Sequence, residues 1–137
     1  LVLEIASNDG YLWKNYVAQD IPVLGIDPAQ NIAAVANQNG VHTLCNFFSE
    51  QLAEDLANQG KQADVIHANN VMAHVPDLHG FMKGIKKVLK PIGTAVIEVP
   101  YLADLVNHLE FDTIYHEHVY YFAVKPLAYL CGLYGLV

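Results

Sequence analysis

The segment TIYHEHVYYF, residues 113–122, places two histidines, a glutamate and three tyrosines within ten residues of an otherwise aliphatic chain. Imidazole, carboxylate and phenol groups can take up, release and share protons. The cluster therefore predicts acid–base chemistry. In an extended strand, Tyr115 and Glu117 would face one side while His116 and His118 faced the other. A site that uses Tyr115, Glu117 and His118 together thus requires a turn or a bent loop.

The HxH spacing of His116 and His118 also fits a metal site, completed by His74 or His108, of the kind that metal-assisted hydrolases use. No local arrangement of carboxylates and histidines provides a third ligand, so we predict a site without metal. His67 lies inside an apolar run, and we expect it to be a hydrogen-bonded core residue rather than a ligand.

Composition limits the partners of the chain. Its 137 residues fit one domain with a single core, and 14 acidic against 7 basic residues give a formal charge of −7. This charge argues against nucleic acid and anionic membrane as partners.

The cysteines and the lack of a long apolar run bear on location. Cys45 and Cys131 fit no CxxC pattern, and we interpret them as buried thiols of a reducing compartment. No apolar run approaches the roughly 20 residues of a membrane span, so we predict a cytoplasmic protein.

Strand and helix patterns alternate along the chain. Apolar runs predict strands at 1–5, 22–27, 42–46, 63–68 and 93–99. Helical periodicity predicts helices at 11–19 and 29–38, a third helix between a Ser49 N-cap and Gly60, and a fourth that begins after Asp77. Pro91 and Gly93 predict a turn before the last strand. The pattern indicates an α/β fold with a mostly parallel sheet and helices on both faces.

Ligands of such sheets bind beyond the carboxyl ends of the strands. The loop EIASNDG, residues 4–10, follows the first strand, and Asp27, before Pro28, closes the second. A carboxylate at the end of the second strand can accept hydrogen bonds from the ribose hydroxyls of a nucleoside. Asn46 and Phe47 follow the third strand.

The loop of residues 4–10 distinguishes between two nucleoside cofactors. Aligned on the dinucleotide fingerprint GxGxxG, it presents Ala6, Asn8 and Tyr11, and the bulky Tyr11 argues against NAD. The looser loop of S-adenosylmethionine (SAM) proteins, an acidic residue followed by alternate glycines, matches at Glu4 and Gly10. Asn8 tolerates the left-handed backbone that such a loop needs. The alternative interpretation is a plain strand-to-helix turn capped by Asp9.

Polar and aromatic residues at the later strand ends support a nucleoside site. An amide and an aromatic ring after the third strand could hold an adenine, and two asparagines follow the fourth strand. Phe47 and Phe48 could equally be core residues, and the asparagines ordinary loop residues. The predicted cofactor-binding residues are Glu4, Ala6, Ser7, Asn8, Asp9, Gly10, Asp27, Pro28, Asn46, Phe47, Asn69 and Asn70.

Five segments together resemble the SAM-dependent C-methyltransferases of deoxysugar biosynthesis, which act on nucleotide-linked 4-keto-6-deoxy sugars. These segments are EIASNDG, GIDP, NNVMAHVPDLHGFMKGI, LKPIGTAVIEVPYLADL and FDTIYHEHVYYF. The resemblance runs over nearly the whole chain, and YHEH is its most specific part. It implies a Rossmann-like class I methyltransferase fold, with residues 1–137 as a single SAM-binding domain truncated at both ends. It also implies a zinc-binding N-terminal region and a C-terminal domain on either side, and family members usually carry glycine in place of Ala6.

The same resemblance implies roles for the cluster. His118 would be the general base that removes an α-proton beside the ketone, and the enolate would then attack the methyl group of SAM. Tyr115 and Glu117 would bind or polarise the substrate. His74 would be a second imidazole at the same edge, or else a loop residue bonded to nearby backbone.

All seven basic residues are lysines, and without the bidentate fork of arginine we expect the nucleotide end of the sugar substrate to be held by the flanking domains. Two alternatives stay open. One is a SAM-dependent O- or N-methyltransferase of another small molecule. The other is a non-catalytic nucleotide-binding module.

Overall fold

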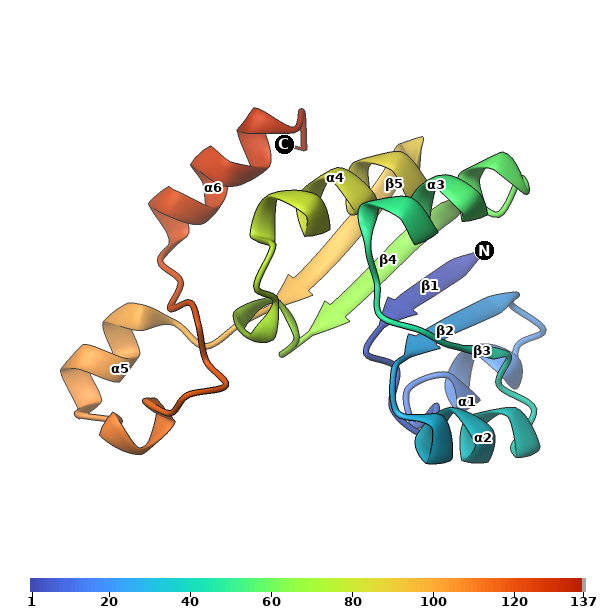
Figure 1. Cartoon of the computed structure of the whole chain (residues 1–137), viewed down its shortest axis with the longest axis horizontal. Helices are drawn as coiled ribbons and strands as arrows, with labels where there is room; N and C mark the ends of the chain where they lie inside the picture. The colour runs from blue at the N-terminus through green and yellow to red at the C-terminus, as the bar shows by residue number, and fades with distance from the viewer. Residues whose placement is uncertain (137) are drawn as a thin grey trace.

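The computed structural model describes residues 1–136; Val137, the last residue of the predicted domain, lies outside the described residues. Five parallel strands form one sheet in the order β3-β2-β1-β4-β5, which confirms the predicted α/β fold (Figure 1). The strands are β1 (Val2–Ile5), β2 (Val23–Asp27), β3 (Thr43–Cys45), β4 (Ala63–Asn69) and β5 (Leu89–Glu98). The strand order reverses between β1 and β4, so their carboxyl ends mark the switch point at which ligands of such sheets bind.

Helices cover both faces of the sheet (Figure 1). On one face, α1 (Lys14–Val17) and α2 (Gln30–Gln38) pack over a small core that includes Val2, Trp13 and Val41. On the other face, α3 (Glu50–Asn58) and α4 (Leu78–Val88) cover the larger core, which contains Leu3, Ile5 and Ile66. Neighbouring residues of β1 thus serve opposite cores, because side chains alternate across a strand.

Two helix starts follow the sequence prediction. The Ser49 hydroxyl accepts a hydrogen bond from the Leu52 amide at 3.2 Å at the start of α3. The Asp77 carboxylate accepts one from the Gly80 amide at 2.8 Å at the start of α4. Both caps face the carboxyl edge of the sheet, because each helix begins where the chain leaves β3 or β4.

Two sequence predictions of local structure were wrong. The helix expected at 11–19 is only α1, since the Tyr11 amide is held in a turn by the Asp9 carboxylate at 3.2 Å and Asp20 adopts φ +54°. The turn expected at Pro91 and Gly93 lies inside β5, where the pairing with β4 shifts register between Ala63 and Val65. The predicted long helix is therefore replaced by turns around a short α1, and the predicted turn is replaced by a longer strand with a bulge.

The chain after β5 forms a separate layer. It contains α5 (Leu102–His108), the short 3-10 helix η2 (Phe111–Thr113) and α6 (Val124–Leu133). Beyond α6 the chain is tied to α4 by a hydrogen bond between Tyr134 and His79 and by one from Lys86 to the Gly135 carbonyl at 3.3 Å. The sequence analysis did not predict these elements.

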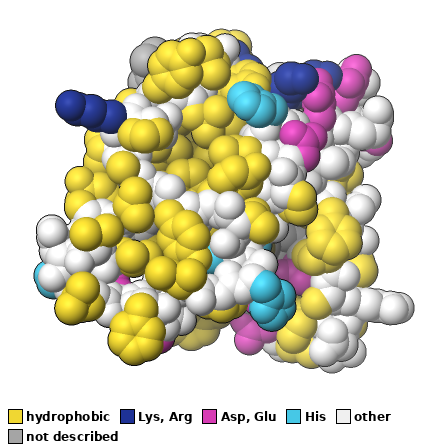
Figure 2. All heavy atoms as spheres, turned by 60° about the vertical axis from the view of Figure 1, so that its left-hand side comes forward, with side chains coloured by type: hydrophobic (Ala, Val, Ile, Leu, Met, Phe, Trp, Pro, Cys, Tyr) yellow, Lys and Arg dark blue, Asp and Glu magenta, His cyan; other side chains and the backbone are white. Residues whose placement is uncertain are grey.

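Hydrophobic side chains dominate the face that this layer presents (Figure 2). Val106, Leu109, Phe111, Val124 and Tyr129 are all more than half exposed there. Within residues 1–136, no helix is both long and apolar enough to cross a membrane.

Candidate cofactor and active site

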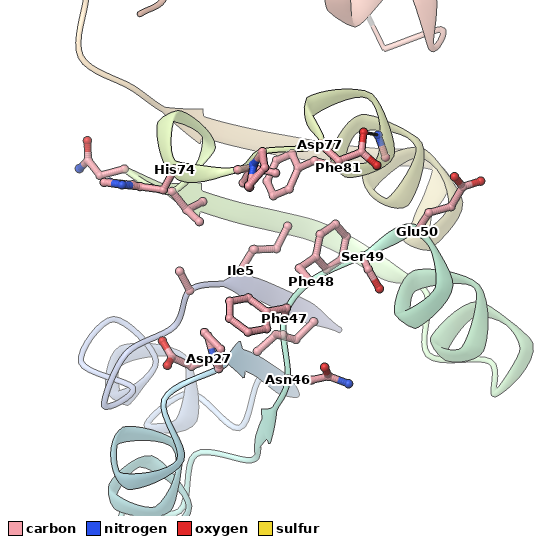
Figure 3. Close-up of a pocket in the computed structure, with 18 of the residues that line it drawn as sticks. Ile5, Asp27, Asn46, Phe47, Phe48, Ser49, Glu50, His74, Asp77 and Phe81 are labelled. Atoms are coloured by element: carbon pink, nitrogen blue, oxygen red, sulfur yellow. Dashed lines mark hydrogen bonds between the residues drawn. The ribbon is translucent and has the colours of Figure 1, made fainter. Parts of the chain in front are cut away.

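A pocket of about 780 Å³ opens at the carboxyl edge of the sheet, between the strand ends and the starts of α3 and α4 (Figure 3). Its walls are mostly apolar, and it is long enough to reach from Asp27 at the end of β2 to His74 in the β4–α4 connection. Predicted cofactor residues that line it are Ala6, Asn8, Asp27, Pro28, Asn46, Phe47, Asn69 and Asn70. The topology therefore gathers eight of the twelve predicted residues around one cavity.

The loop after β1 has the backbone of a glycine-rich loop without most of the glycines. Ala6 and Asn8 adopt left-handed conformations with φ +59° and +50°. The Ile26 carbonyl accepts hydrogen bonds from the amides of Ala6 at 2.8 Å and Ser7 at 3.2 Å. These bonds hold the loop against β2, and they offset the cost of a left-handed alanine.

Asp27, at the end of β2, holds the same loop through a hydrogen bond. One carboxylate oxygen accepts a hydrogen bond from the Asn8 amide at 3.0 Å, and the other accepts one from the Ala29 amide at 2.9 Å. The side chain is buried, yet it lines the pocket. Since each carboxylate oxygen has two lone pairs, Asp27 keeps acceptor capacity for ribose hydroxyls.

Glu4 is a buried acid in β1 that does not itself line the pocket, although it is hydrogen-bonded to Asn69, which does. Its residue is only 6% exposed, and one carboxylate oxygen accepts a hydrogen bond from the Asn69 amide group at 3.4 Å. The other oxygen, Oε2, is buried without a hydrogen-bond partner among residues 1–136. Burial raises the pKa of Glu4 from 4.5 to about 7.

The remaining predicted loop residues shape the loop rather than line the large pocket. Ser7 is buried over β2, where a side chain on Gly25 would lie 2.5 Å from its hydroxyl. Asp9 holds the turn at Tyr11, as the alternative interpretation expected. Gly10 has φ +81° and packs so closely on Val41 that an added Cβ would approach it within 2.9 Å. Asp9 and Gly10 line a separate, smaller pocket.

The structure separates two adjacent phenylalanines that the sequence left equivalent. Phe47 is 75% exposed and stands at the pocket (Figure 3). Phe48 also lines the pocket, but its ring packs edge-to-face on Phe81 of α4, with 5.4 Å between centroids. Phe47 thus has a free face for stacking, whereas Phe48 forms part of the wall.

The histidine segment is a turn, as convergence of its side chains required. The His118 amide donates to the Tyr115 carbonyl at 3.0 Å and closes the turn. The ring of His118 lies 2.9 Å from the Thr113 carbonyl through Nδ1 and 3.0 Å from the Tyr115 hydroxyl through Nε2. Because a carbonyl only accepts, Nδ1 carries the proton, and Nε2 of the neutral ring accepts from Tyr115.

His74 joins this cluster from the η1 turn (Met72–His74). Its ring centroid lies 4.7 Å from that of His118, and its Nδ1 donates to the Glu117 carbonyl at 3.0 Å. His74 is thus bonded to backbone and lies beside the ring of His118, while its part in the reaction stays a prediction. In the neutral ring the lone pair of Nε2 remains available, and His74 lines the pocket.

The turn is fixed to the β4–α4 connection by two further bonds. The Val119 amide donates to the Ala73 carbonyl at 2.9 Å, and the Tyr120 hydroxyl donates to the Pro76 carbonyl at 3.2 Å. Segments more than forty residues apart in sequence therefore hold the histidine pair at the mouth of the cofactor pocket.

Glu117 departs from the arrangement that the sequence analysis expected. Its side chain is 63% exposed and pairs with His116, which is 91% exposed, at 3.9 Å. At the tip of the turn its carboxylate extends into solvent, and its backbone carbonyl is the group that contacts His74. Among residues 1–136, no three His, Cys, Asp or Glu side chains are arranged to hold a metal ion.

Sequence analysis missed part of the wall of the large pocket. Val75, Pro76, Asp77, Gly80 and Phe81 line it from the β4–α4 connection and the first turn of α4. The signal for them was present, because a helix that begins with a cap directly after a strand has its first turn at the carboxyl edge of the sheet.

Comparison with known proteins identifies the family. A sequence family described as "Methyltransferase domain" matches residues 1–137. The chain belongs to this methyltransferase family. It is 38% identical over 136 residues to the C-methyltransferase NovU of Streptomyces niveus, a match that covers 99% of this chain and 32% of the relative. It is 32% identical over 97 residues to a ubiquinone biosynthesis O-methyltransferase of Bartonella bacilliformis, covering 70% of this chain and 39% of the relative.

Solved structures agree with this assignment. A SAM-dependent methyltransferase from Archaeoglobus fulgidus superposes with a TM-score of 0.81 at 17% identity, over 98% of this chain and 59% of that one. The fold is therefore that of the Rossmann-like class I methyltransferases, and the methyltransferase uses SAM as its cofactor. The chain spans about a third of the length of the curated relatives that it matches.

The residues present fit SAM. Glu4, buried with an unpaired oxygen and bonded to the pocket-lining Asn69, has the charge that would balance the cationic amino group of the cofactor's methionine part. Asp27 suits the ribose, and the exposed ring of Phe47 suits the adenine. No arginine or lysine side chain lines the pocket within the described residues, which agrees with a cofactor that carries no phosphate.

Proposed function

We propose that this methyltransferase transfers a methyl group to carbon, on a nucleotide-linked 4-keto-6-deoxy sugar. The observation that carries the proposal is the pair of imidazoles, His74 and His118, 4.7 Å apart at the mouth of the cofactor pocket. Both O- and C-methylation need a base, but a proton on the carbon beside a ketone is harder to remove than a hydroxyl proton, so C-methylation places the greater demand on a positioned base. The NovU relative, a C-methyltransferase matched over nearly the whole chain, supports the same chemistry.

In this proposal His118 is the general base. The Thr113 carbonyl holds its Nδ1–H, so the basic atom is Nε2. Without substrate, Nε2 accepts a hydrogen bond from the Tyr115 hydroxyl. In the proposal, the entering substrate breaks this hydrogen bond and displaces the hydroxyl. Nε2 then takes the α-proton, the electron pair of the broken C–H bond forms the enolate, and the displaced Tyr115 hydroxyl donates to the enolate oxygen.

Held in the pocket, SAM would supply an electrophilic methyl group to the enolate carbon, and S-adenosylhomocysteine would leave with the electron pair of the broken C–S bond. His74 offers the lone pair of Nε2 to a hydroxyl of the sugar, because its Nδ1–H is held by the Glu117 carbonyl. The exposed carboxylate of Glu117 would act on substrate only at the rim of the site.

The nucleotide end of the substrate is assigned to parts of a longer protein. The seven cationic side chains of the chain are lysines, and a diphosphate is held best by arginine forks and backbone amides. We propose that a zinc-binding N-terminal region and a C-terminal domain supply these groups. The apolar face over α5 and α6 offers a surface on which a further domain could pack.

Mass spectrometry tests the reaction. The full-length protein is incubated with SAM and several nucleotide-linked 4-keto-6-deoxy sugars, and the expected product gains one methyl group. His118→Asn should abolish this gain while SAM affinity stays within about twofold, because the ring touches the substrate and not the cofactor pocket. A folded, SAM-binding protein that methylates none of these sugars would overturn the proposal.

The likeness to ubiquinone biosynthesis O-methyltransferases supports a second candidate, methylation of oxygen on another small molecule. A substrate deuterated at the α-carbon separates the two. Transfer to carbon releases that deuterium to solvent and transfer to oxygen retains it. If neither the sugars nor a panel of small hydroxylated acceptors are methylated while SAM still binds, we infer a non-catalytic nucleotide-binding module.

A further inference from the structure

Gly84 lies in the interior of α4, buried beneath the wall of the cofactor pocket. A Cβ added to it would lie 2.9 Å from Cε1 and 3.1 Å from Cζ of Phe48. Carbon atoms at such distances overlap, so an alanine here would displace the Phe48 ring. The glycine therefore permits the close approach of Phe48 to α4.

Phe48 stands between α4 and the pocket. On the side of α4, its ring lies against Gly84 and packs edge-to-face on Phe81. On its other side, Phe48 lines the cavity (Figure 3). Phe81 is 2% exposed and is part of the main core, so it cannot yield. A Phe48 ring displaced from α4 can move toward the cavity, which it already lines.

We propose that Gly84 sets the width of the adenine end of the cofactor pocket by keeping Phe48 against α4. It is a positioning residue, since it acts through Phe48 and contacts no ligand. The inference rests on the placement of adenine beside Asn46 and Phe47, and it goes beyond the proposed reaction because it concerns cofactor binding alone. A glycine in the middle of a helix is unfavourable relative to alanine, which is consistent with a steric role.

The other helical glycines do not share this geometry. A Cβ on Gly80 would meet the carboxylate of its own helix cap, Asp77, at 2.2 Å. A Cβ on Gly132 in α6 would have no neighbour within 4 Å among the described residues. Gly132→Ala is thus a matched control, with the same change in a helix and free space around it.

Calorimetric titration of the purified protein with S-adenosylhomocysteine tests the proposal without any sugar substrate. Gly84→Ala should weaken binding about tenfold or more, and should weaken binding of adenosine by the same factor, because the defect lies at the adenine end. Gly132→Ala should bind like the wild type. The double variant Phe48→Leu/Gly84→Ala should recover affinity to within about threefold, since leucine is shorter than the ring that clashes.

Wild-type affinity in Gly84→Ala would overturn the proposal. So would a weakened or unfolded Gly84→Ala variant that Phe48→Leu does not rescue, because the obstacle would then be the Ser49 carbonyl, 3.3 Å from the added Cβ, and not the Phe48 ring. Neither result depends on whether the protein methylates carbon, oxygen or nothing.

Discussion

Nε2 of His118 and the hydroxyl of Tyr115 lie 3.0 Å apart, and Nδ1 of the same ring lies 2.9 Å from the Thr113 carbonyl. The turn of residues 115–118 thus fixes both the tautomer and the orientation of the imidazole before any substrate arrives. In the proposed reaction the imidazole is thus already oriented, and displacement of the Tyr115 hydroxyl from Nε2 is the change that frees it to accept a proton.

Removal of the Tyr115 hydroxyl should slow the reaction without affecting the cofactor. Tyr115→Phe keeps the ring beside His118 but loses the donor that we assign to the enolate oxygen, and we expect kcat to fall about 100-fold. Tyr129→Phe is the control, because Tyr129 is 71% exposed on α6. Steady-state rates with the full-length protein and titration with SAM measure the two quantities. An unchanged kcat in Tyr115→Phe would show that the hydroxyl plays no part in the reaction.

Glu4 should make SAM binding depend on pH. Its pKa in the folded protein is raised to about 7 by burial, and the ionised carboxylate is the form that attracts the amino group of SAM. Affinity should therefore rise between about pH 6 and pH 8 and then level off. Glu4→Gln should bind more weakly at pH 8 and lose this rise, whereas Asp20→Asn at the exposed far side of the molecule should keep it. Calorimetric titration across that range measures both curves, and a flat wild-type curve would contradict the assignment.

The same carboxyl should affect folding in the opposite direction. The folded pKa of Glu4 exceeds the ordinary 4.5, so the folded state holds its proton more tightly than the unfolded chain does. The stability that comes from this proton is complete below about pH 4.5 and is lost as the pH rises to about 7. This pKa shift lowers the free energy of unfolding at neutral pH by about 3 kcal/mol, relative to the same protein with Glu4 protonated. Denaturant unfolding at pH 8 without cofactor should show Glu4→Gln to be more stable than the wild type, and an equal or lower stability would count against the buried, unpaired carboxylate.

Asp27 should be needed both for the cofactor and for the loop. Asp27→Ala removes the acceptor of the Asn8 and Ala29 amides together with the proposed ribose contact. Each lost hydrogen bond to a charged group costs about 1.5 to 3 kcal/mol, so we expect saturable SAM binding to disappear from calorimetric titrations. NAD should bind neither protein. Saturable NAD binding to the wild type would instead require the loop of residues 4–10 to be reinterpreted as a dinucleotide site.

Trp13, the single tryptophan, should report the ionisation of His67. The Tyr16 hydroxyl lies 3.0 Å from Nε2 of His67, and the ring centroids of Trp13 and His67 are 6.0 Å apart. Burial lowers the pKa of His67 below 6.5, so the neutral ring predominates at pH 7. Because a protonated imidazole quenches nearby indole emission, Trp13 fluorescence should fall as the pH drops through a midpoint below 6.5.

Folding stability should fall over the same interval, because below pH 6.5 the unfolded chain binds the His67 proton more readily than the folded protein does. His67→Gln should remove the fluorescence step, and His42→Gln, at an exposed position, should keep it. A step that survives in His67→Gln would assign the titration to another group. The bond to Tyr16 confirms that His67 is hydrogen-bonded, but the residue is half-buried rather than part of the core.

Local signals in the sequence were enough for most of the scaffold. The apolar runs located all five strands, and the capping side chains of Ser49 and Asp77 located the starts of α3 and α4. The parallel order of strands then placed Asp27, Asn46 and Asn69 at one edge. These features depend on hydrophobic periodicity and on hydrogen bonds between residues near in sequence, both of which are present in the sequence itself.

Other features depended on contacts between distant segments. Only packing decided that Phe48 would turn to Phe81 while Phe47 stayed free, because two adjacent aromatic side chains carry the same propensity. The bulge that takes Gly93 into β5 depends on the Ala63 and Asp64 carbonyls, 3.0 Å from where its Cβ would be. Neither the orientation of Phe48 nor the bulge at Gly93 can therefore be predicted from the local sequence alone.

The sequence by itself determined the fold class, the edge of the sheet that carries the site, and the chemical character of the YHEH cluster. Tertiary structure decided which of those groups converge: it brought His74 beside His118 and left the carboxylate of Glu117 in solvent. The physical reason is that convergence is set by the bonds from residues 117–120 to residues 73–76. Those bonds form only after β4, η1 and the turn have been packed together.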